Sequence, residues 1–166
     1  MVYDTLAALT CCVSLGIEVE VAIKAINKFK GVKRRFKETI IKDDVYIDDY
    51  AHHPSKINAI IDAVKQKYKN KKVIAFFRPD RVSRLDYFAS LFISSLKRAD
   101  EFYILPFNSS NNEEITSYKN FMREYNLKEL SEETYLEIAR KKDVVYLMMS
   151  SKNMDEVKSS IMKYKG

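Results

Sequence analysis

The sequence predicts an α/β fold: a doubly wound, mostly parallel sheet of about six strands with helices on both faces, preceded by two helices. Three observations lead to this prediction. Strand-like and helix-like segments alternate from residue 45 to the end of the chain. Residues 73–77 form an unbroken apolar run, which is typical of a strand buried on both faces of a parallel sheet. Residues 57–68 repeat apolar side chains at intervals of three and four, as an amphipathic helix does. Parallel strands joined by right-handed crossover helices follow from this alternation.

The first 28 residues predict two short helices. The first is apolar nearly all round, and Gly16 is suited to end it because glycine readily adopts the left-handed conformation of a helix C-terminus. The second carries an apolar stripe formed by Val19, Ala22, Ile23 and Ile26. The composition changes after Gly31, so we expect a domain boundary there, between residues 1–31 and residues 32–166.

Beyond this boundary the pattern predicts a hairpin and then an alternating series. Residues 35–41 and 45–49 flank the turn-like residues 42–44, which predicts a β-hairpin. The further strands that we expect are 73–77, 101–105 and 143–148. The helices that we expect are 54–69, 83–97, 113–125, 131–141 and 153–163.

Composition narrows the class of protein. The 166 residues are 46% hydrophobic, which suffices for one main domain. The net charge of +6 suggests a nucleic-acid partner, but the densest basic stretch, residues 65–72, closes an amphipathic helix, so we expect none. No apolar run reaches membrane-spanning length, and no secretory signal precedes the first helix. Cys11 and Cys12 are helix neighbours that do not ordinarily form a disulfide, so we expect a cytoplasmic protein.

Glycine is nearly absent from the chain. Gly16, Gly31 and Gly166 are the only three, and neither GxxxxGK[ST] nor GxGxxG occurs. A phosphate-binding loop needs glycine where backbone N–H groups approach the phosphates closely. We therefore expect that this chain cannot by itself hold a nucleotide triphosphate in the manner of a P-loop.

Residues 48–54 read Asp-Asp-Tyr-Ala-His-His-Pro and lie at a predicted strand-to-helix turn. Ligands of open α/β sheets bind at such turns. A ligand site would use a carboxylate for ribose hydroxyls and a ring beside a base. The alternative is a polar turn in which Asp and His cap the following helix. We expect no metal, because the chain holds no further histidine and the spacing matches no zinc pattern.

Two basic clusters accompany this turn. Lys33-Arg34-Arg35 follows Gly31 and is either a solvated surface or a group that reaches a phosphate. The second cluster, residues 78–84, directly follows the apolar strand, and its Arg81 and Arg84 are spaced to bind a carboxylate or phosphate from one side of a helix start. In the alternative interpretation these two arginines pair with acidic neighbours such as Asp80 and Asp86.

Taken together, Phe29 to Phe36, Asp48 to Pro54 and Pro79 to Arg84 resemble the C-terminal region of the Mur ligases, most closely the alanine-adding branch. The resemblance is strong from about residue 4 to residue 105 and fades beyond. It implies that residues 1–31 are the last helices of a central ATPase domain and that residues 32–166 are the Rossmann-like C-terminal domain. It also implies that the chain is a piece of a larger ligase whose P-loop, magnesium ligands and UDP-sugar domain lie upstream.

The activity implied by the resemblance is an ATP-dependent ligation in peptidoglycan synthesis, and hence in cell-wall formation, cell shape and cell division. The muramoyl carboxylate of UDP-N-acetylmuramate is activated as an acyl phosphate, which the amine of L-alanine attacks. ATP with Mg²⁺ is the implied cofactor, and no residue of this piece alone is expected to be catalytic, so the isolated chain should be inactive. The implied ATP contacts are Arg34, Arg35, Asp49, Tyr50, His52 and His53. The implied contacts to a substrate carboxylate are Asp80, Arg81, Ser83 and Arg84.

Two departures from the alanine-adding pattern leave the acceptor open. That branch usually has histidine where this chain has Asp80, which places a negative charge beside the carboxylate contacts. It also usually carries a small glycine-rich loop after its last strand, where residues 149–152 read Met-Ser-Ser-Lys. The alternatives are therefore a muropeptide-recycling Mur ligase domain, a degenerate paralogue, or a stand-alone α/β binding module without catalysis.

Overall fold

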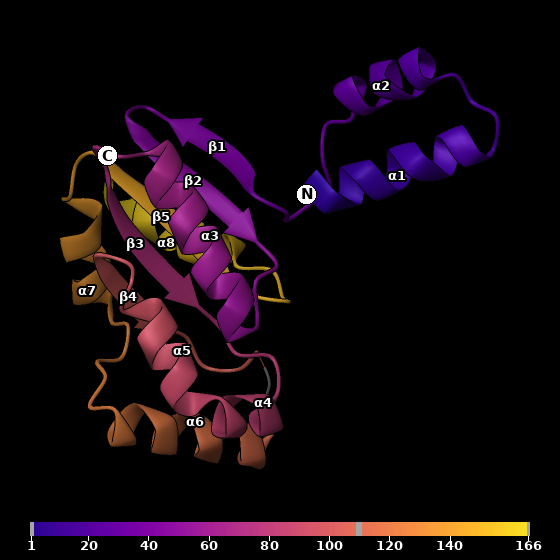
Figure 1. Cartoon of the computed structure of the whole chain (residues 1–166). Coiled ribbons are helices and arrows are strands. Elements are labelled where there is room, and N and C mark those ends of the chain that lie inside the picture. The colour runs from indigo at the N-terminus through magenta and orange to yellow at the C-terminus, as the bar shows by residue number, and fades with distance from the viewer. Residues whose placement is uncertain (1, 109–110, 166) are drawn as a thin grey trace. The chain divides into compact units, whose positions relative to one another are not determined.

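The computed structural model describes residues 2–108 and 111–165 of the chain. The chain divides into two compact units, Met1–Lys33 and Arg34–Gly166 (Figure 1). The division lies two residues after the boundary at residue 31 that the change in composition indicates. The second unit holds the sheet and every residue considered below as a candidate for ligand contact.

The first unit is a pair of helices, α1 (Val2–Ser14) and α2 (Val19–Lys28). Gly16 has a φ of +82°, and the N–H of Ile17 donates to the carbonyl of Cys12 at 3.0 Å, so α1 ends in the left-handed turn that glycine favours. Ala22 is the only buried side chain among the described residues of this unit. Leu6, Val13 and Ile23 are each more than two-fifths exposed. These helices therefore bury almost none of the apolar surface that their sequence carries.

The second unit is built on one five-stranded sheet. The strand order is β1-β2-β5-β3-β4, with β1 antiparallel to β2 and the other neighbours parallel. The strands are β1 (Lys37–Ile41), β2 (Asp44–Asp49), β3 (Lys72–Phe77), β4 (Glu101–Ile104) and β5 (Val144–Met149). The described residues form five strands, which correspond to the five segments that the sequence pattern indicates one by one, so the expected total of about six is one too high.

Helices cover both faces of the sheet (Figure 1). Apolar residues of α3, α5 and α6 share one core cluster with alternate residues of the strands, and those of α7 and α8 share the other. The helices are α3 (Pro54–Lys67), α4 (Val82–Tyr87), α5 (Ala89–Leu96), α6 (Asn112–Glu124), α7 (Glu132–Ala139) and α8 (Asp155–Lys165). The predicted doubly wound arrangement is confirmed, since the sheet is sandwiched between two helical layers.

The expected helix over residues 83–97 is wrong as one continuous element. It breaks at Phe88, whose φ of −107° and ψ of 19° leave the helical region, so that α4 and α5 are separate. The ring of Phe88 packs edge-on against the ring of His53 at a centroid distance of 4.9 Å. This tertiary contact is invisible to a pattern of apolar spacing along one segment.

The buried centre of the sheet agrees with the prediction. Every residue from Val73 to Phe77 is fully buried, and β5 beside it is buried along its whole length. Because β2, β5, β3 and β4 run in parallel, their carboxyl ends emerge at one edge of the sheet. No helix in the described part of the chain combines the length and apolarity that crossing a bilayer requires.

Candidate functional site

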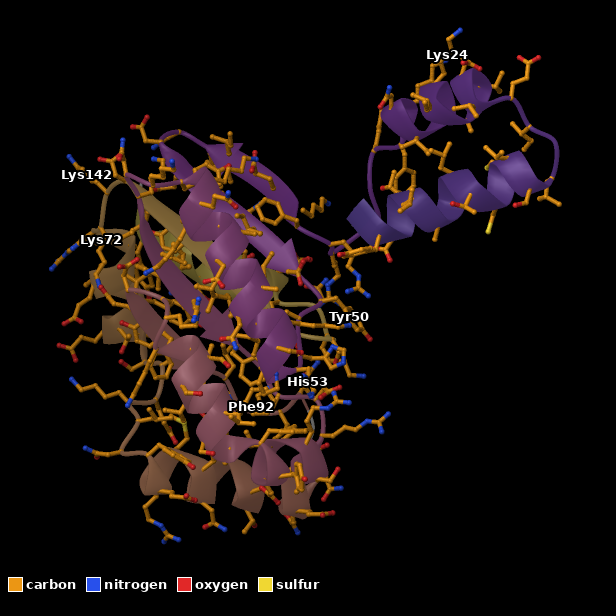
Figure 2. All side chains as sticks on the ribbon, viewed as in Figure 1. Lys24, Tyr50, His53, Lys72, Phe92 and Lys142 are labelled. Atoms are coloured by element: carbon orange, nitrogen blue, oxygen red, sulfur yellow. The ribbon has the colours of Figure 1, made fainter. Side chains whose placement is uncertain are left out.

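The carboxyl edge of the sheet brings three sequence-distant loops together. Asp49, Met149 and Phe77 lie in register at the ends of β2, β5 and β3. The loops that follow them therefore leave the sheet side by side. Figure 2 shows Tyr50 and His53 at this end, and Lys72 and Lys142 at the opposite end. The turn at residues 48–54 thus lies where ligands of open α/β sheets bind.

Asp49 ends β2, and both of its carboxylate oxygens accept backbone hydrogen bonds. Oδ1 accepts from the N–H of Ala51 at 2.8 Å, and Oδ2 accepts from the N–H of Phe36 at 2.8 Å. The carboxylate therefore ties the turn after β2 to the segment that leads into β1. Each oxygen has a second lone pair, so the group can still accept from a ligand hydroxyl while its orientation is fixed.

Arg34 turns its guanidinium toward the loop after β5. Nη1 donates to the carbonyl of Ser151 at 3.0 Å, and Nη2 donates to the carbonyls of Ser150 at 2.5 Å and of Lys152. Nε lies 3.3 Å from Oδ2 of Asp48. The backbone of Arg34 has a φ of +57°, and its carbonyl accepts from the N–H of Tyr50 at 2.8 Å. Both terminal nitrogens of this arginine therefore donate to protein carbonyls, whereas Nε is buried and makes the ion pair without a hydrogen bond.

Asp48 is the half-buried partner of Arg34. Burial and the negative charges of Asp155 and Asp49 raise the pKa of the Asp48 carboxyl, the Arg34 guanidinium lowers it, and the pKa is raised overall. Its Oδ1 is buried and accepts no hydrogen bond from any described residue. The ion pair with Arg34 therefore offsets only part of the free-energy cost of burying this carboxylate.

Arg35 differs from its neighbour. Its side chain is exposed, and it makes no hydrogen bond or ion pair with any residue that the structure describes. Its guanidinium lies 5.2 Å from the centroid of the Tyr50 ring, within the range of a cation–π contact. The ring of His52 packs edge-on against the ring of Tyr50, at a centroid distance of 5.1 Å. A cation, a phenol ring and an imidazole therefore gather beside Asp49.

The two histidines have different partners. Nδ1 of His52 lies 2.8 Å from the carbonyl of Tyr50, and this nitrogen must carry the proton to donate there, which leaves Nε2 as an acceptor in the neutral ring. His53 occupies the N-cap of α3, where its Nδ1 accepts from the N–H of Ser55 at 3.4 Å. The helix-capping alternative left open by the sequence therefore applies to His53, while His52 keeps a nitrogen for other use.

The second basic cluster, residues 78–84, also contains an arginine that pairs with a protein group and one that does not. Nη1 of Arg84 donates to both carboxylate oxygens of Asp80, at 2.7 and 2.8 Å. Arg81 stands exposed at the N-cap of α4 and has no hydrogen bond or ion pair within the described ranges. Ser83 is exposed as well. Asp86 accepts from the hydroxyl of Ser117 at 2.7 Å instead of pairing with an arginine.

Arg78 is a further arginine at this edge, to which the sequence pattern assigned no role of its own. It is buried, with 7% of its surface exposed. Nε donates to the carbonyl of Pro106 at 3.0 Å, Nη1 to that of Asn153 at 3.2 Å, and Nη2 pairs with Glu156 at 2.5 Å. The one sequence signal for the burial of Arg78 was its position. It directly follows a strand that is buried on both faces, so its side chain begins inside the core.

A hollow lies apart from Asp49, Tyr50 and the basic clusters. A cavity of about 390 Å³ opens between the α4–α5 region and α6, with Asp86, Ser117 and Asn120 in its lining. Asp86, which the sequence offered as a possible partner of the arginines, is in its lining, but none of the residues expected to contact ATP or a substrate carboxylate is. Among the described residues, no three His, Cys, Asp or Glu side chains converge in a way that could hold a metal ion.

Comparison with known proteins identifies relatives of this arrangement. Residues 34–151 match the family described as Mur ligase, glutamate ligase domain. Among solved structures, the UDP-N-acetylmuramate-alanine ligase MurC of Thermotoga maritima is 21% identical with a TM-score of 0.67, over 98% of this chain and 36% of that one. A murein peptide ligase, Mpl, of Psychrobacter arcticus is 20% identical with a TM-score of 0.67, over 99% of this chain and 36% of that one.

A third solved structure is similar in the same range. The MurF ligase of Thermotoga maritima, in complex with ADP, is 21% identical with a TM-score of 0.64, over 95% of this chain and 35% of that one. At these identities the likeness is one of fold. The chain spans about a third of the length of the solved structures that it matches.

Proposed function

The chain belongs to the Mur ligase family through its glutamate ligase domain, and from this premise we propose that it forms the C-terminal domain of an ATP-dependent amide-bond ligase of peptidoglycan synthesis in the cytoplasm. In this proposal residues 32–166 close over ATP and position the acceptor, while residues 1–31 are the last helices of a preceding ATPase domain. Two findings support that division. The first unit leaves Leu6, Val13 and Ile23 exposed, and the solved relatives are about three times as long as this chain.

The observation that carries the ATP proposal is the group of side chains beside Asp49. Arg35 offers a guanidinium with no protein acceptor among the described residues, and Tyr50 and His52 offer rings next to it. We propose that Arg35 contacts a phosphate, that Asp49 accepts from the ribose, and that the rings pack beside the base. Arg34 and His53, which already bond to protein groups, then support these contacts rather than making them. We propose that the Mg²⁺ that accompanies ATP is held mainly by the preceding ATPase domain.

The acceptor side is proposed to be the loop after β3. Arg81 has no partner within the described residues and would bind a substrate carboxylate, with Ser83 and the Asp80–Arg84 pair beside it. The finer proposal is that the ligase adds L-alanine to UDP-N-acetylmuramate. ATP phosphorylates the muramoyl carboxylate and ADP leaves. The amine then attacks the acyl carbon, phosphate departs, and the amine loses a proton. The domain's part is to hold these anionic groups in place and to exclude water.

A second acceptor class, a muropeptide rather than a single amino acid, is favoured by one observation. Asp80 neutralises Arg84, which weakens this loop as a site for a small carboxylate. Both ligase proposals require ATP turnover, whereas a stand-alone binding module would show none.

The test is an acceptor-dependent assay on a polypeptide that contains this chain together with a P-loop domain. Release of ADP with UDP-N-acetylmuramate is measured with L-alanine and, separately, with a muropeptide. L-alanine dependence supports the first acceptor and muropeptide dependence the second. An absence of ADP release with both acceptors would leave the binding module as the better description.

The ATP contact is tested in the same assay with Arg35→Ala. Loss of a hydrogen bond to a charged phosphate costs about 1.5–3 kcal/mol, so the KM for ATP should rise by roughly tenfold or more while the KM for the acceptor stays near its original value. Lys142→Ala is the matched control, because Lys142 is an exposed cation at the opposite end of the sheet (Figure 2). An unchanged KM for ATP in Arg35→Ala contradicts the assignment.

A further inference from the structure

The loop after β5 directs four successive backbone carbonyls toward two arginines. The carbonyls of Ser150, Ser151 and Lys152 accept from the Arg34 guanidinium, and that of Asn153 accepts from Arg78 at 3.2 Å. Backbone carbonyls ordinarily bond to backbone N–H groups of neighbouring elements. Here side chains from residues 34 and 78 replace those donors. The loop therefore depends for its shape on residues that are far away in sequence.

Arg34 is suited to this role by both its chemistry and its position. A guanidinium offers five N–H donors in a rigid plane, so a single side chain can bind several carbonyls at once. The Arg34 side chain is only 21% exposed, and Arg34 is the first residue of the second unit. Its backbone carbonyl accepts from Tyr50 while its side chain holds the loop. One residue thus connects the end of β2 to the loop that follows β5.

The loop in turn contacts the residues beside which ATP is proposed to bind. The N–H of Ser150 donates to the carbonyl of Asp49 at 3.1 Å, extending the pairing of β2 with β5 by one bond. Residues 149–152 contain no glycine. Because any displacement of residues 150–152 pulls on Asp49 directly and on Tyr50 through Arg34, the loop and the turn after β2 form one connected structure.

We propose that Arg34 is a positioning residue: it locks the loop 150–152 in one conformation and thereby holds Asp49 and Tyr50 in the geometry that ATP requires. The locking of the loop stands on the contacts alone. Its effect on ATP rests on the proposed function. Arg34 itself makes no contact with the nucleotide in this proposal, which separates its role from that of Arg35.

The loop part is tested on this chain by limited digestion with trypsin, which cleaves after lysine and so reports on the exposed Lys152. Cleavage at Lys152 should be at least about tenfold faster in Arg34→Ala, because proteolysis follows the population of locally opened chain. Arg35→Ala is the matched control and should remain within about twofold of the parent chain. Millimolar guanidinium, added to Arg34→Ala, should slow the cleavage at Lys152 again by filling the vacated site, whereas methylammonium at the same concentration should not. Because guanidinium also binds the specificity pocket of trypsin, the rate at Lys152 is expressed relative to the rates at the other lysines of the same chain.

Arg34→Lys keeps the charge but offers a single donor centre, and it serves where Arg34→Ala fails to fold. It should also be cleaved faster at Lys152, because one ammonium group cannot reproduce the planar set of contacts. Equal cleavage rates at Lys152 in Arg34→Lys and the parent chain overturn the proposed lock. Faster cleavage at all lysines together would show general unfolding and would overturn it as well.

The ATP part is tested in the longer ligase. Arg34→Ala should raise the KM for ATP by roughly tenfold, and guanidinium should lower it again. A purely structural role would reduce the amount of active enzyme, and hence the apparent kcat, while leaving this KM unchanged. If the parent ligase shows no ATP turnover, the proposed function fails while the digestion experiment still decides whether Arg34 locks the loop.

Discussion

Two pairs of arginines at the carboxyl edge of the sheet have opposite environments. Arg34 and Arg78 donate to backbone carbonyls and are largely buried. Arg35 and Arg81 are exposed and bond to no described protein acceptor. Each buried arginine lies within three residues of an exposed one along the chain. Within one basic motif, therefore, one arginine can stabilise the structure of the site while another stays available to contact a ligand.

The largest expected effect on stability concerns the buried arginines. Arg78→Met should lower the free energy of unfolding by about 3 kcal/mol or more, because it leaves the carbonyls of Pro106 and Asn153 without their donor. Denaturant titration measures this change. Arg98→Met is the control. Among the residues that the structure describes, the half-exposed Arg98 side chain pairs only with Asp62 at the surface, so its loss should cost about 0–1 kcal/mol. Equal costs in the two variants would contradict the distinction.

The adjacent residues His52 and His53 allow a similar comparison, with a smaller expected loss of stability. His53→Ala should destabilise the second unit by about 1 kcal/mol, because it removes the N-cap of α3 and the ring contact with Phe88. His52→Ala removes a hydrogen bond to the carbonyl of Tyr50 and an edge-on contact with the Tyr50 ring, but no helix cap, and should cost less. Thermal unfolding of the two variants in parallel measures the difference. A larger loss in His52→Ala would reverse the assignment of the cap.

The partner of Arg34 gives a prediction that depends on pH. Burial raises the pKa of Asp48, so the folded protein binds this proton more tightly than the unfolded chain does. Stability from this group is therefore greatest at low pH and declines as pH rises through the raised pKa. Asp48→Asn removes that decline. Relative to the parent chain, the variant should be more stable at about pH 7 than at about pH 4 in denaturant titrations. Asp62→Asn, at the surface, should show no such trend.

The smallest expected effect is on the exposed side. Arg81→Ala should change the free energy of unfolding by no more than about 0.5 kcal/mol, because the described structure gives its guanidinium no bond to lose. Denaturant titration again measures the change. A loss of about 2 kcal/mol or more would mean that Arg81 supports the fold as Arg78 does, and the proposed acceptor contact would lose its basis.

The elements of the second unit could largely be predicted from local pattern. The apolar run at residues 73–77 identified the buried β3, and the spacing of apolar residues identified α3. The break at Phe88 could not be predicted, since it accompanies a ring contact with a residue 35 positions earlier. The strand order was equally hidden, because nothing in the sequence of β5 states that it lies between β2 and β3.

The candidate site was predictable by place but not by role. Strand-to-helix turns rich in polar residues indicated the carboxyl edge. Which of Arg34 and Arg35 is buried depends on the backbone at residue 34, where φ is +57°, and on a loop more than 100 residues away. Neither the backbone conformation of residue 34 nor its contact with that loop can be predicted from two consecutive arginines. The Asp80–Arg84 pair was one of two alternatives that spacing alone could not separate.

The central position of β5 has a consequence for how the domain is made. β5 is the last strand to be synthesised, yet it lies between β2 and β3. On the ribosome, the pairs β1–β2 and β3–β4 exist before the strand that joins them has emerged. Until then the facing edges of β2 and β3 are unpaired, and unpaired edges invite association with other chains. A nascent chain halted before Val144 would lack the strand that joins these two pairs, so the sheet is completed only once residues 144–149 have emerged.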